Sequence, residues 1–200
     1  SRLRRRARQY LDAGLTDAAQ ITLEALLERV PDDAPARMEL ANVLLGRGQL
    51  QASTRQLLQI ARLPAGNVPL LVQTIRRLYF HGEIVAARSC LDRLERAPDP
   101  PALLLAEQAQ LRWMLGEIPA AMALIERASA AGVETPDACY LHAMLSQFTG
   151  NIAQARGMLE ACLRRWPNFG DAAVALANVR RQTPEANDLG LLRERLRRMP

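Results

Sequence analysis

Residues 102–135 read ALLLAEQAQLRWMLGEIPAAMALIERASAAGVET and contain one full period of a repeat that runs along most of the 200-residue chain. The fifteenth residue of this stretch is a glycine, and a glycine recurs along the chain at a constant spacing of 34 residues. A period of this length is typical of helix–turn–helix hairpins that stack on one another. The sequence therefore predicts an all-α solenoid. The repeated glycines are Gly14, Gly48, Gly82, Gly116 and Gly150.

Three further positions of the period keep their size in every repeat, or nearly so. Position 20 is small, which lets the two helices of a hairpin approach closely, and position 24 is a large aliphatic residue that can fill the space between hairpins. Position 8 is small in four of five repeats. The glycines are expected to turn the chain with positive φ. Positions 8, 20 and 24 hold, in order, Ala7, Ala41, Ile75, Ala109 and Ala143; Ala19, Ser53, Ala87, Ala121 and Ala155; and Leu23, Leu57, Leu91, Ile125 and Leu159.

This pattern resembles the tetratricopeptide repeat family across nearly the whole chain. The resemblance implies a right-handed α-solenoid of antiparallel hairpins. The family's bulky aromatic residue at position 11 is present only as Tyr10, and Arg112 and Ser146 replace it in the last two repeats. We expect these two residues to disturb the packing there, with Trp113 filling the space in the fourth repeat. The expected repeats are about 1–33, 34–67, 68–101, 102–135 and 136–169, followed by a capping or linker helix pair at 170–200.

The charge distribution disfavours a nucleic-acid partner. The formal charge of +5 comes from the ends, because five arginines lie in residues 1–8 and four in residues 193–198. Between them stand 17 arginines against 20 acidic residues. A solenoid that follows a phosphate backbone should carry a basic stripe along its length. The chain has no lysine and is rich in Ala and Leu, which suggests GC-rich bacterial coding.

The cysteines and the apolar runs indicate a cytoplasmic protein without a membrane span. Cys90, Cys139 and Cys162 lack the spacing of metal ligands and fall at or beside apolar repeat positions, so we expect single buried thiols. No run approaches the ~18 apolar residues of a transmembrane helix, and the first residues contain no apolar run that would make a signal peptide. Because the chain begins within the repeat pattern, we expect it to be part of a longer protein.

The residues of a catalytic site are missing from the sequence. We find no glycine-rich phosphate loop, no nucleophile in a recognisable setting and no cluster with metal-ligand spacing. His81 is predicted to end a first helix, where a cation suits the helix dipole, and His142 to be packed. Asp32, Asp33 and Asp99 precede first helices and are predicted to cap them. The sequence therefore predicts a non-enzymatic chain without cofactor or metal.

The resemblance also implies a concave groove lined by the first helix of each repeat, at positions 2, 5, 9, 12 and 13. Five of the eight aromatic residues occupy such positions in repeats three to five. The functional interpretation is a groove with a cationic half and an aromatic, Met-rich half that binds a peptide or helix. The alternative is that these side chains pack between adjacent first helices or under the final helix. The candidates are Arg4, Arg8, Asn42 and Arg76, then Tyr79, Phe80, Gln110, Trp113, Met114, Tyr140, Met144 and Phe148.

The four polar candidates also resemble the set with which some family members hold a partner's C-terminal carboxylate. Glu39 and Pro69, however, stand where such a clamp would have polar or basic groups. A ladder of groove asparagines, as in glycosyltransferase-linked arrays, is also interrupted.

After residue 169 the pattern predicts a sixth first helix, roughly 171–181, and then a last helix. Thr183 and Pro184 are typical of the start of that helix, and Leu189, Leu192 and Leu196 would form its apolar stripe. Residues 179–187 resemble the junction in bacterial sulfotransferases that carry an N-terminal tetratricopeptide array. That likeness implies a non-catalytic part of a larger enzyme.

Three functional hypotheses follow. The first is a protein-interaction domain, within a sulfotransferase-linked polypeptide, that presents the acceptor or dimerises the enzyme. The second is a free-standing adaptor for envelope or secretion assembly. The third is a groove that contributes to a composite active site with a downstream catalytic domain.

Overall fold

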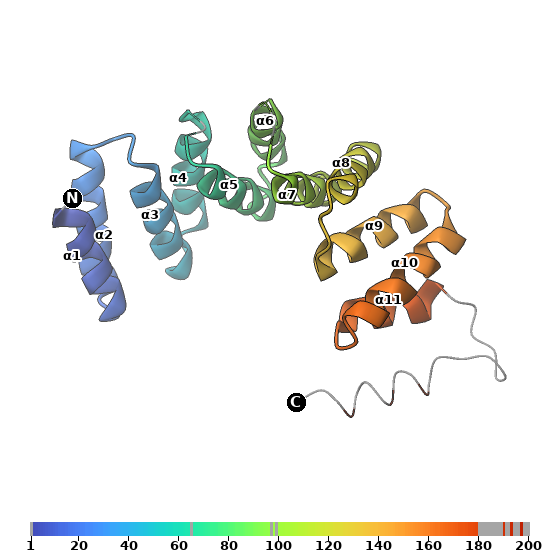
Figure 1. Cartoon of the computed structure of the whole chain (residues 1–200). Helices are drawn as coiled ribbons and strands as arrows, with labels where there is room; N and C mark the ends of the chain where they lie inside the picture. Colours follow the sequence, from blue (N-terminus) through green and yellow to red (C-terminus); the bar gives the residue numbers. More distant parts are fainter. Residues whose placement is uncertain are drawn as a thin grey trace. The chain divides into compact units, whose positions relative to one another are not determined.

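The computed structural model describes residues 2–64, 66–96, 98 and 100–179, together with the single residues 190, 193 and 197. Within these residues the chain forms α-helices and no strand, which confirms the all-α prediction (Figure 1). The helices are α1 (Arg2–Asp12), α2 (Thr16–Arg29), α3 (Ala34–Gly46), α4 (Leu50–Arg62), α5 (Val68–Phe80), α6 (Ile84–Glu95), α7 (Ala102–Met114), α8 (Ile118–Ala130), α9 (Pro136–Phe148), α10 (Ile152–Arg165) and α11 (Gly170–Val179).

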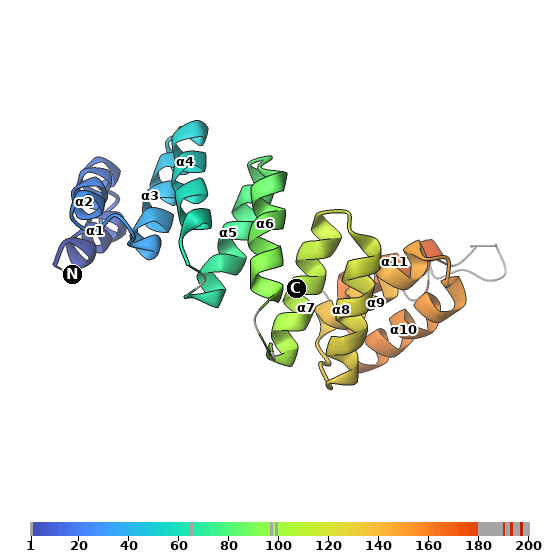
Figure 2. The same cartoon turned by 90° about the horizontal axis from the view of Figure 1, so that it is seen from above.

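The helices belong to two compact units, residues 1–98 with α1–α6 and residues 99–200 with α7–α11. In the first unit α1 pairs with α2, α3 with α4 and α5 with α6, while α2 packs on α3 and α4 on α5. In the second unit α7 pairs with α8 and α9 with α10, while α8 packs on α9 and α11 on α10. Each unit is thus a row of stacked helical hairpins (Figures 1 and 2).

The repeated glycines make the turns inside the hairpins. All five have positive φ, between 71° and 88°, as predicted. At Gly116 the φ of 76° lets the chain reverse so that the amide of Glu117 donates to the carbonyl of Arg112, at 2.9 Å. This bond satisfies a carbonyl that the end of α7 would otherwise leave without a partner. A residue with a Cβ adopts this backbone conformation only with strain.

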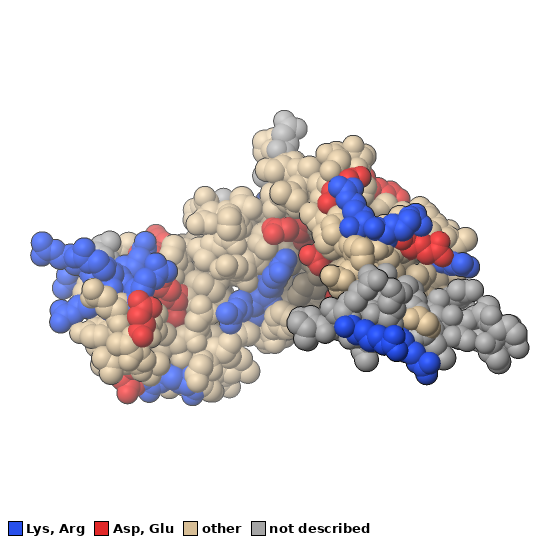
Figure 3. Space-filling view, turned by 60° about the horizontal axis from the view of Figure 1, so that its bottom comes forward, with Lys and Arg blue, Asp and Glu red and all other residues tan. Residues whose placement is uncertain are grey.

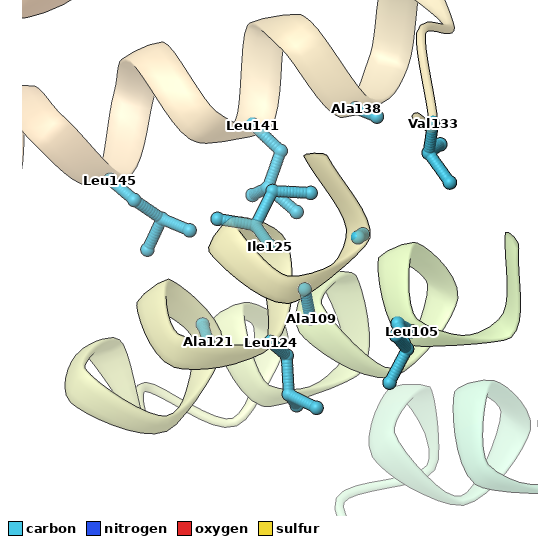
Figure 4. Close-up of a cluster of buried hydrophobic side chains, with 10 residues drawn as sticks. Leu105, Ala109, Ala121, Leu124, Ile125, Val133, Ala138, Leu141 and Leu145 are labelled. Carbon is cyan, nitrogen blue, oxygen red and sulfur yellow. The ribbon is translucent and has the colours of Figure 1, made fainter. Parts of the chain in front are cut away.

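The residues at positions 8, 20 and 24 belong to the cores of both units. All fifteen side chains are at most 2% exposed. Ser53, the polar member, donates its hydroxyl to the carbonyl of Ala41 at 2.8 Å. In the second unit Ile125 of α8 lies beside Leu141 of α9 (Figure 4), within a cluster that also includes residues of α7. Burying an aliphatic side chain of this size contributes about 1.5–3 kcal/mol, so each hairpin depends on its neighbours for stability.

Arg112 and Ser146 do not disturb the last hairpins, contrary to the expectation from the sequence. Arg112 is only 8% exposed and forms an ion pair with Glu117 at the turn. Ser146 is fully buried, and its hydroxyl donates to the carbonyl of His142 at 2.9 Å. Both polar groups are satisfied inside their hairpins, so burial costs little. Trp113 lies at the edge of the core cluster, partly buried.

Helix starts follow the capping prediction in part. Asp33 caps α3 by accepting a hydrogen bond from the amide of Ala36 at 3.0 Å. The N-cap of α7 is Pro101, which makes no side-chain cap, and Asp99 lies outside the described residues. Leu189, Leu192 and Leu196 of the predicted last helix also lie outside the described residues. So do residues 180–187 of the segment that resembles the sulfotransferase junction.

Among the described residues, no helix is both long and apolar enough to cross a membrane.

Candidate functional site

A cavity of about 180 Å³ opens among the first helices of the second unit, α7, α9 and α11. It brings together four residues that the sequence placed in the groove, and three that it did not. The predicted residues are Gln110, Trp113, Tyr140 and Met144; the others are Asp137, Leu141 and Asp171.

Aromatic contacts hold the rings of this cavity. The indole of Trp113 on α7 meets the ring of Phe148 on α9 edge to face, with centroids 4.8 Å apart and planes at 78°. Tyr140 makes the same kind of contact with Phe169, at 5.9 Å and 88°. Phe148 itself is 63% exposed. Trp113 therefore packs between adjacent first helices, as the alternative interpretation of the sequence proposed. It also lines the cavity.

The cavity carries two carboxylates and no basic side chain. Asp137 lies in the first turn of α9 and Asp171 in the first turn of α11, where the helix dipole favours a negative charge. Neither carboxylate has an ion pair or hydrogen bond to any residue that the structure describes. Burial first, and then the charge of Asp171, raise the pKa of Tyr140, so its phenol stays protonated at neutral pH and can donate a hydrogen bond.

The positions of these two aspartates in the repeat could have indicated that they lie in the groove. Both follow the first residue of a repeat, at position 2, which is one of the groove positions. Asp137 is a common residue type at its position and does not stand out as the rare aromatic residues do, and Asp171 lies in an incomplete repeat. Of the other predicted residues of this unit, Met114 is half-buried at the end of α7 and Phe148 is exposed beside Trp113.

In the first unit, two of the three predicted arginines lie beside an acidic side chain of the chain. Arg4 forms an ion pair with Asp33, and Arg8 lies 3.7 Å from a carboxylate oxygen of Glu39. Figure 3 shows arginines gathered at the left end of the molecule, where α1 lies, with acidic side chains beside them. Arg4 also lines a cavity of about 360 Å³ with apolar residues of the loops before α3 and α5. Two of the four residues that resemble a carboxylate clamp thus have an acidic neighbour within the chain.

The remaining candidates of the first unit are dispersed. Asn42 is exposed on α3, and Arg76 on α5 has a buried Nε without a hydrogen-bond partner among the described residues. Tyr79 and Phe80 meet edge to face at 5.4 Å at the end of α5, and Phe80 is 74% exposed.

His81 lies at the end of a first helix, as predicted, in surroundings that favour its neutral form. It caps the C-terminus of α5, and its Nδ1 lies 2.8 Å from the hydroxyl of Thr54. Burial, followed by the nearby charge of Arg77, lowers the pKa of His81, so the imidazole is neutral at pH 7.

A further cavity of about 210 Å³ lies among α8, α9 and α10 and is lined by Cys139, Cys162 and His142 among others. All three cysteines are free, and burial raises the pKa of Cys139 and Cys162, which makes them poor nucleophiles. Burial lowers the pKa of His142. In the described part of the chain, no three His, Cys, Asp or Glu side chains are placed to hold a metal ion.

Stacked 34-residue helical hairpins with a cavity among their first helices define a helical repeat protein. The profile of the tetratricopeptide repeat family matches residues 4–67. A tetratricopeptide repeat protein from Parabacteroides merdae aligns with a TM-score of 0.73 at 16% identity, over 89% of this chain and 71% of that one. The chain therefore has the tetratricopeptide repeat fold.

Two other solved structures share this fold. MamA from Desulfovibrio magneticus aligns with a TM-score of 0.59 at 16% identity, over 74% of this chain and 84% of that one. YrrB, a tetratricopeptide repeat protein with an unusual peptide-binding site, aligns with a TM-score of 0.56 at 15% identity, over 78% of this chain and 81% of that one. Among curated proteins, no sequence matches the chain significantly.

Proposed function

We propose that the chain is an interaction module that binds a peptide or helix of a partner protein at the cavity of α7, α9 and α11. The observation that supports this is the convergence of Trp113, Tyr140 and Met144, from two helices, on one hollow. Aromatic side chains in concave pockets contribute most of the binding energy in protein interfaces. Gln110 and the two aspartates add the few polar groups that fix a ligand's orientation.

The structural context supports binding over catalysis. The cysteines of the neighbouring cavity have raised pKa values, and the lowered pKa of His142 is explained by its burial. The YrrB structure, which shares the fold, is of a protein with a peptide-binding site. Peptide recognition is therefore the function that this surface serves best.

Selection of peptides from an unbiased library on the full chain tests the proposal. We expect enriched peptides whose binding is lost in Trp113→Ala and kept in Trp166→Ala. Trp166 is the matched control because it lies in the same unit but lines the cavity of α8, α9 and α10. Enriched peptides that bind both variants equally well, or the absence of any enriched peptide, would contradict the proposal.

We further propose that the module belongs to a larger bacterial polypeptide with a sulfotransferase domain. Its support is the likeness of residues 179–187 to the junction of such proteins. Reading the same frame past residue 200 tests this. A sulfonate-donor loop there supports an accessory domain, whereas a stop codon shortly after would leave a free-standing adaptor.

A further inference from the structure

The carboxylates of the second unit divide into those that pair with an arginine and those that are exposed without one. Residues 100–179 contain seven acidic side chains and five arginines. Three of the acids are paired with arginine, in the pairs Arg112–Glu117, Arg156–Glu160 and Arg165–Glu134. Of the four acids with no such pair among the described residues, two line one cavity, and they are Asp137 and Asp171. The cavity therefore concentrates negative charge that no described cation offsets.

The aromatic lining of the cavity suits a cation as well. The faces of Trp and Tyr rings attract cations, and tryptophan attracts them most strongly. Trp113 and Tyr140 line the cavity together with the two aspartates. A guanidinium is flat and weakly hydrated, stacks on aromatic rings and donates two parallel hydrogen bonds to a carboxylate, whereas a lysine ammonium is a strongly hydrated point charge. An arginine side chain therefore matches this lining better than a lysine.

The described residues contain an example of an arginine that meets both an aromatic ring and a carboxylate. In the cavity of α8, α9 and α10, the guanidinium of Arg165 lies 5.0 Å from the ring centre of Trp166 and forms an ion pair with Glu134. The cavity of α7, α9 and α11 has the ring and the carboxylates but lacks a described arginine.

Helix dipoles alone do not account for the two aspartates. A helix N-terminus carries roughly half a positive charge, which leaves each carboxylate with net negative charge. The side chain of Thr135, and not that of Asp137, caps α9. The charge of Asp171 is also felt within the cavity, since it adds to the burial that raises the pKa of Tyr140.

From this lining we propose that the cavity receives an arginine side chain of the bound partner, held by Asp137 and Asp171 against the rings of Trp113 and Tyr140. The inference rests on the proposed peptide-binding function and adds the chemistry of the ligand. The nitrogen atoms of the guanidinium would donate to the two carboxylates, and its flat face would stack on the two rings.

The probe is N-acetyl-L-arginine amide, with N-acetyl-L-citrulline amide as the neutral analogue of nearly the same shape. Each is titrated into the full chain while the indole N–H signals of the two tryptophans are followed by NMR. We expect arginine amide to shift the Trp113 signal and leave Trp166 unmoved, because Trp166 already has Arg165 over its ring. Citrulline amide should shift neither. Equal shifts with citrulline, or a larger shift at Trp166, would overturn the proposal.

Aspartate variants and a control variant test whether the two carboxylates of the cavity bind the arginine side chain. Asp137→Asn with Asp171→Asn should weaken binding of arginine amide about tenfold or more, whereas Glu126→Gln, an exposed residue of α8 outside the cavity, should leave it unchanged. If Asp137→Asn and Asp171→Asn together fail to fold, as judged by circular dichroism, Asp171→Asn alone serves. An unchanged affinity in the folded aspartate variant means that the carboxylates do not hold the cation.

A last variant distinguishes a partner's arginine from the chain's own. Residues 180–198 contain six arginines, and in the full chain all six are replaced by glutamine. Unchanged affinity for arginine amide supports a partner as the source, while a tenfold gain would identify the chain's own arginines as occupants and overturn the proposal. Peptides selected through Trp113 that contain no arginine would refute this inference and leave the peptide-binding function intact.

Discussion

Replacing Trp113 by alanine separates binding from folding, because the residue both borders the core and lines the cavity. A fully buried tryptophan replaced by alanine costs about 3–5 kcal/mol, but Trp113 is only partly buried. Its edge-to-face contact with Phe148 contributes about 0.5–1.5 kcal/mol. We expect Trp113→Ala to lower the free energy of unfolding by about 2 kcal/mol, with helicity unchanged at 25 °C.

Leu111→Ala on the same helix is the matched control. Leu111 is 1% exposed and does not line the cavity, so its replacement should cost about 2–5 kcal/mol of stability without affecting affinity. Urea unfolding followed by circular dichroism gives the stability, and titration of a library-selected peptide gives the affinity. Trp113→Ala should lose about 2 kcal/mol of binding free energy or more. The reasoning is refuted if Trp113→Ala unfolds more easily than Leu111→Ala while peptide affinity stays the same.

Further predictions concern the core, the turns and the histidines. Ile125→Ala should cost about 2–5 kcal/mol because the side chain is fully buried, whereas Ile21→Ala, at a 66% exposed residue, should change stability by about 0.5 kcal/mol or less; equal losses in urea unfolding would contradict the core assignment. Gly116→Ala should destabilise by about 1 kcal/mol because φ is +76°, while Gly157→Ala, inside α10 with open space at its Cβ, should stabilise by about 0.5–1 kcal/mol; the two melting temperatures should move in opposite directions. The pKa of His142 is lowered on folding, so the unfolded chain binds a proton first as the pH falls below 6.5, and stability should decrease from pH 7 toward pH 5. His142→Asn should reduce that dependence and leave the part that His81, whose pKa is also lowered, contributes; an unchanged slope would show that His142 does not cause it.

Sequence reasoning located the hairpins because their determinants are local. Gly116 needs a positive φ whatever surrounds it, and Ile125 must be buried wherever two hairpins meet. The sequence-based prediction was wrong where a buried polar side chain has a partner within its own hairpin. Arg112 was expected to disturb packing, but Glu117, five residues on, neutralises it at the turn. A helix C-terminus suits a cation at His81, but burial lowers its pKa and favours the neutral form.

The aromatic residues of the candidate site could be predicted from the sequence, but the cavity and its aspartates could not, because they depend on packing between helices. Trp113 and Tyr140 stood out as rare residues at groove positions, but whether they line a hollow or fill the core depends on helices that are distant in sequence. Asp137 and Asp171 are 34 residues apart and come together only when α11 packs against α9.

By itself, the sequence determined the repeat, the turns and the residues that must be buried, since backbone conformation at glycine and the period of apolar residues act over one hairpin. Only the tertiary structure decided which charges remain without a counterion. Arg4 and Arg8 lie beside Asp33 and Glu39, while Asp137 and Asp171 have no arginine partner among the described residues. The physical reason is that an ion pair depends on the distance between side chains from different hairpins, and that distance is set by packing.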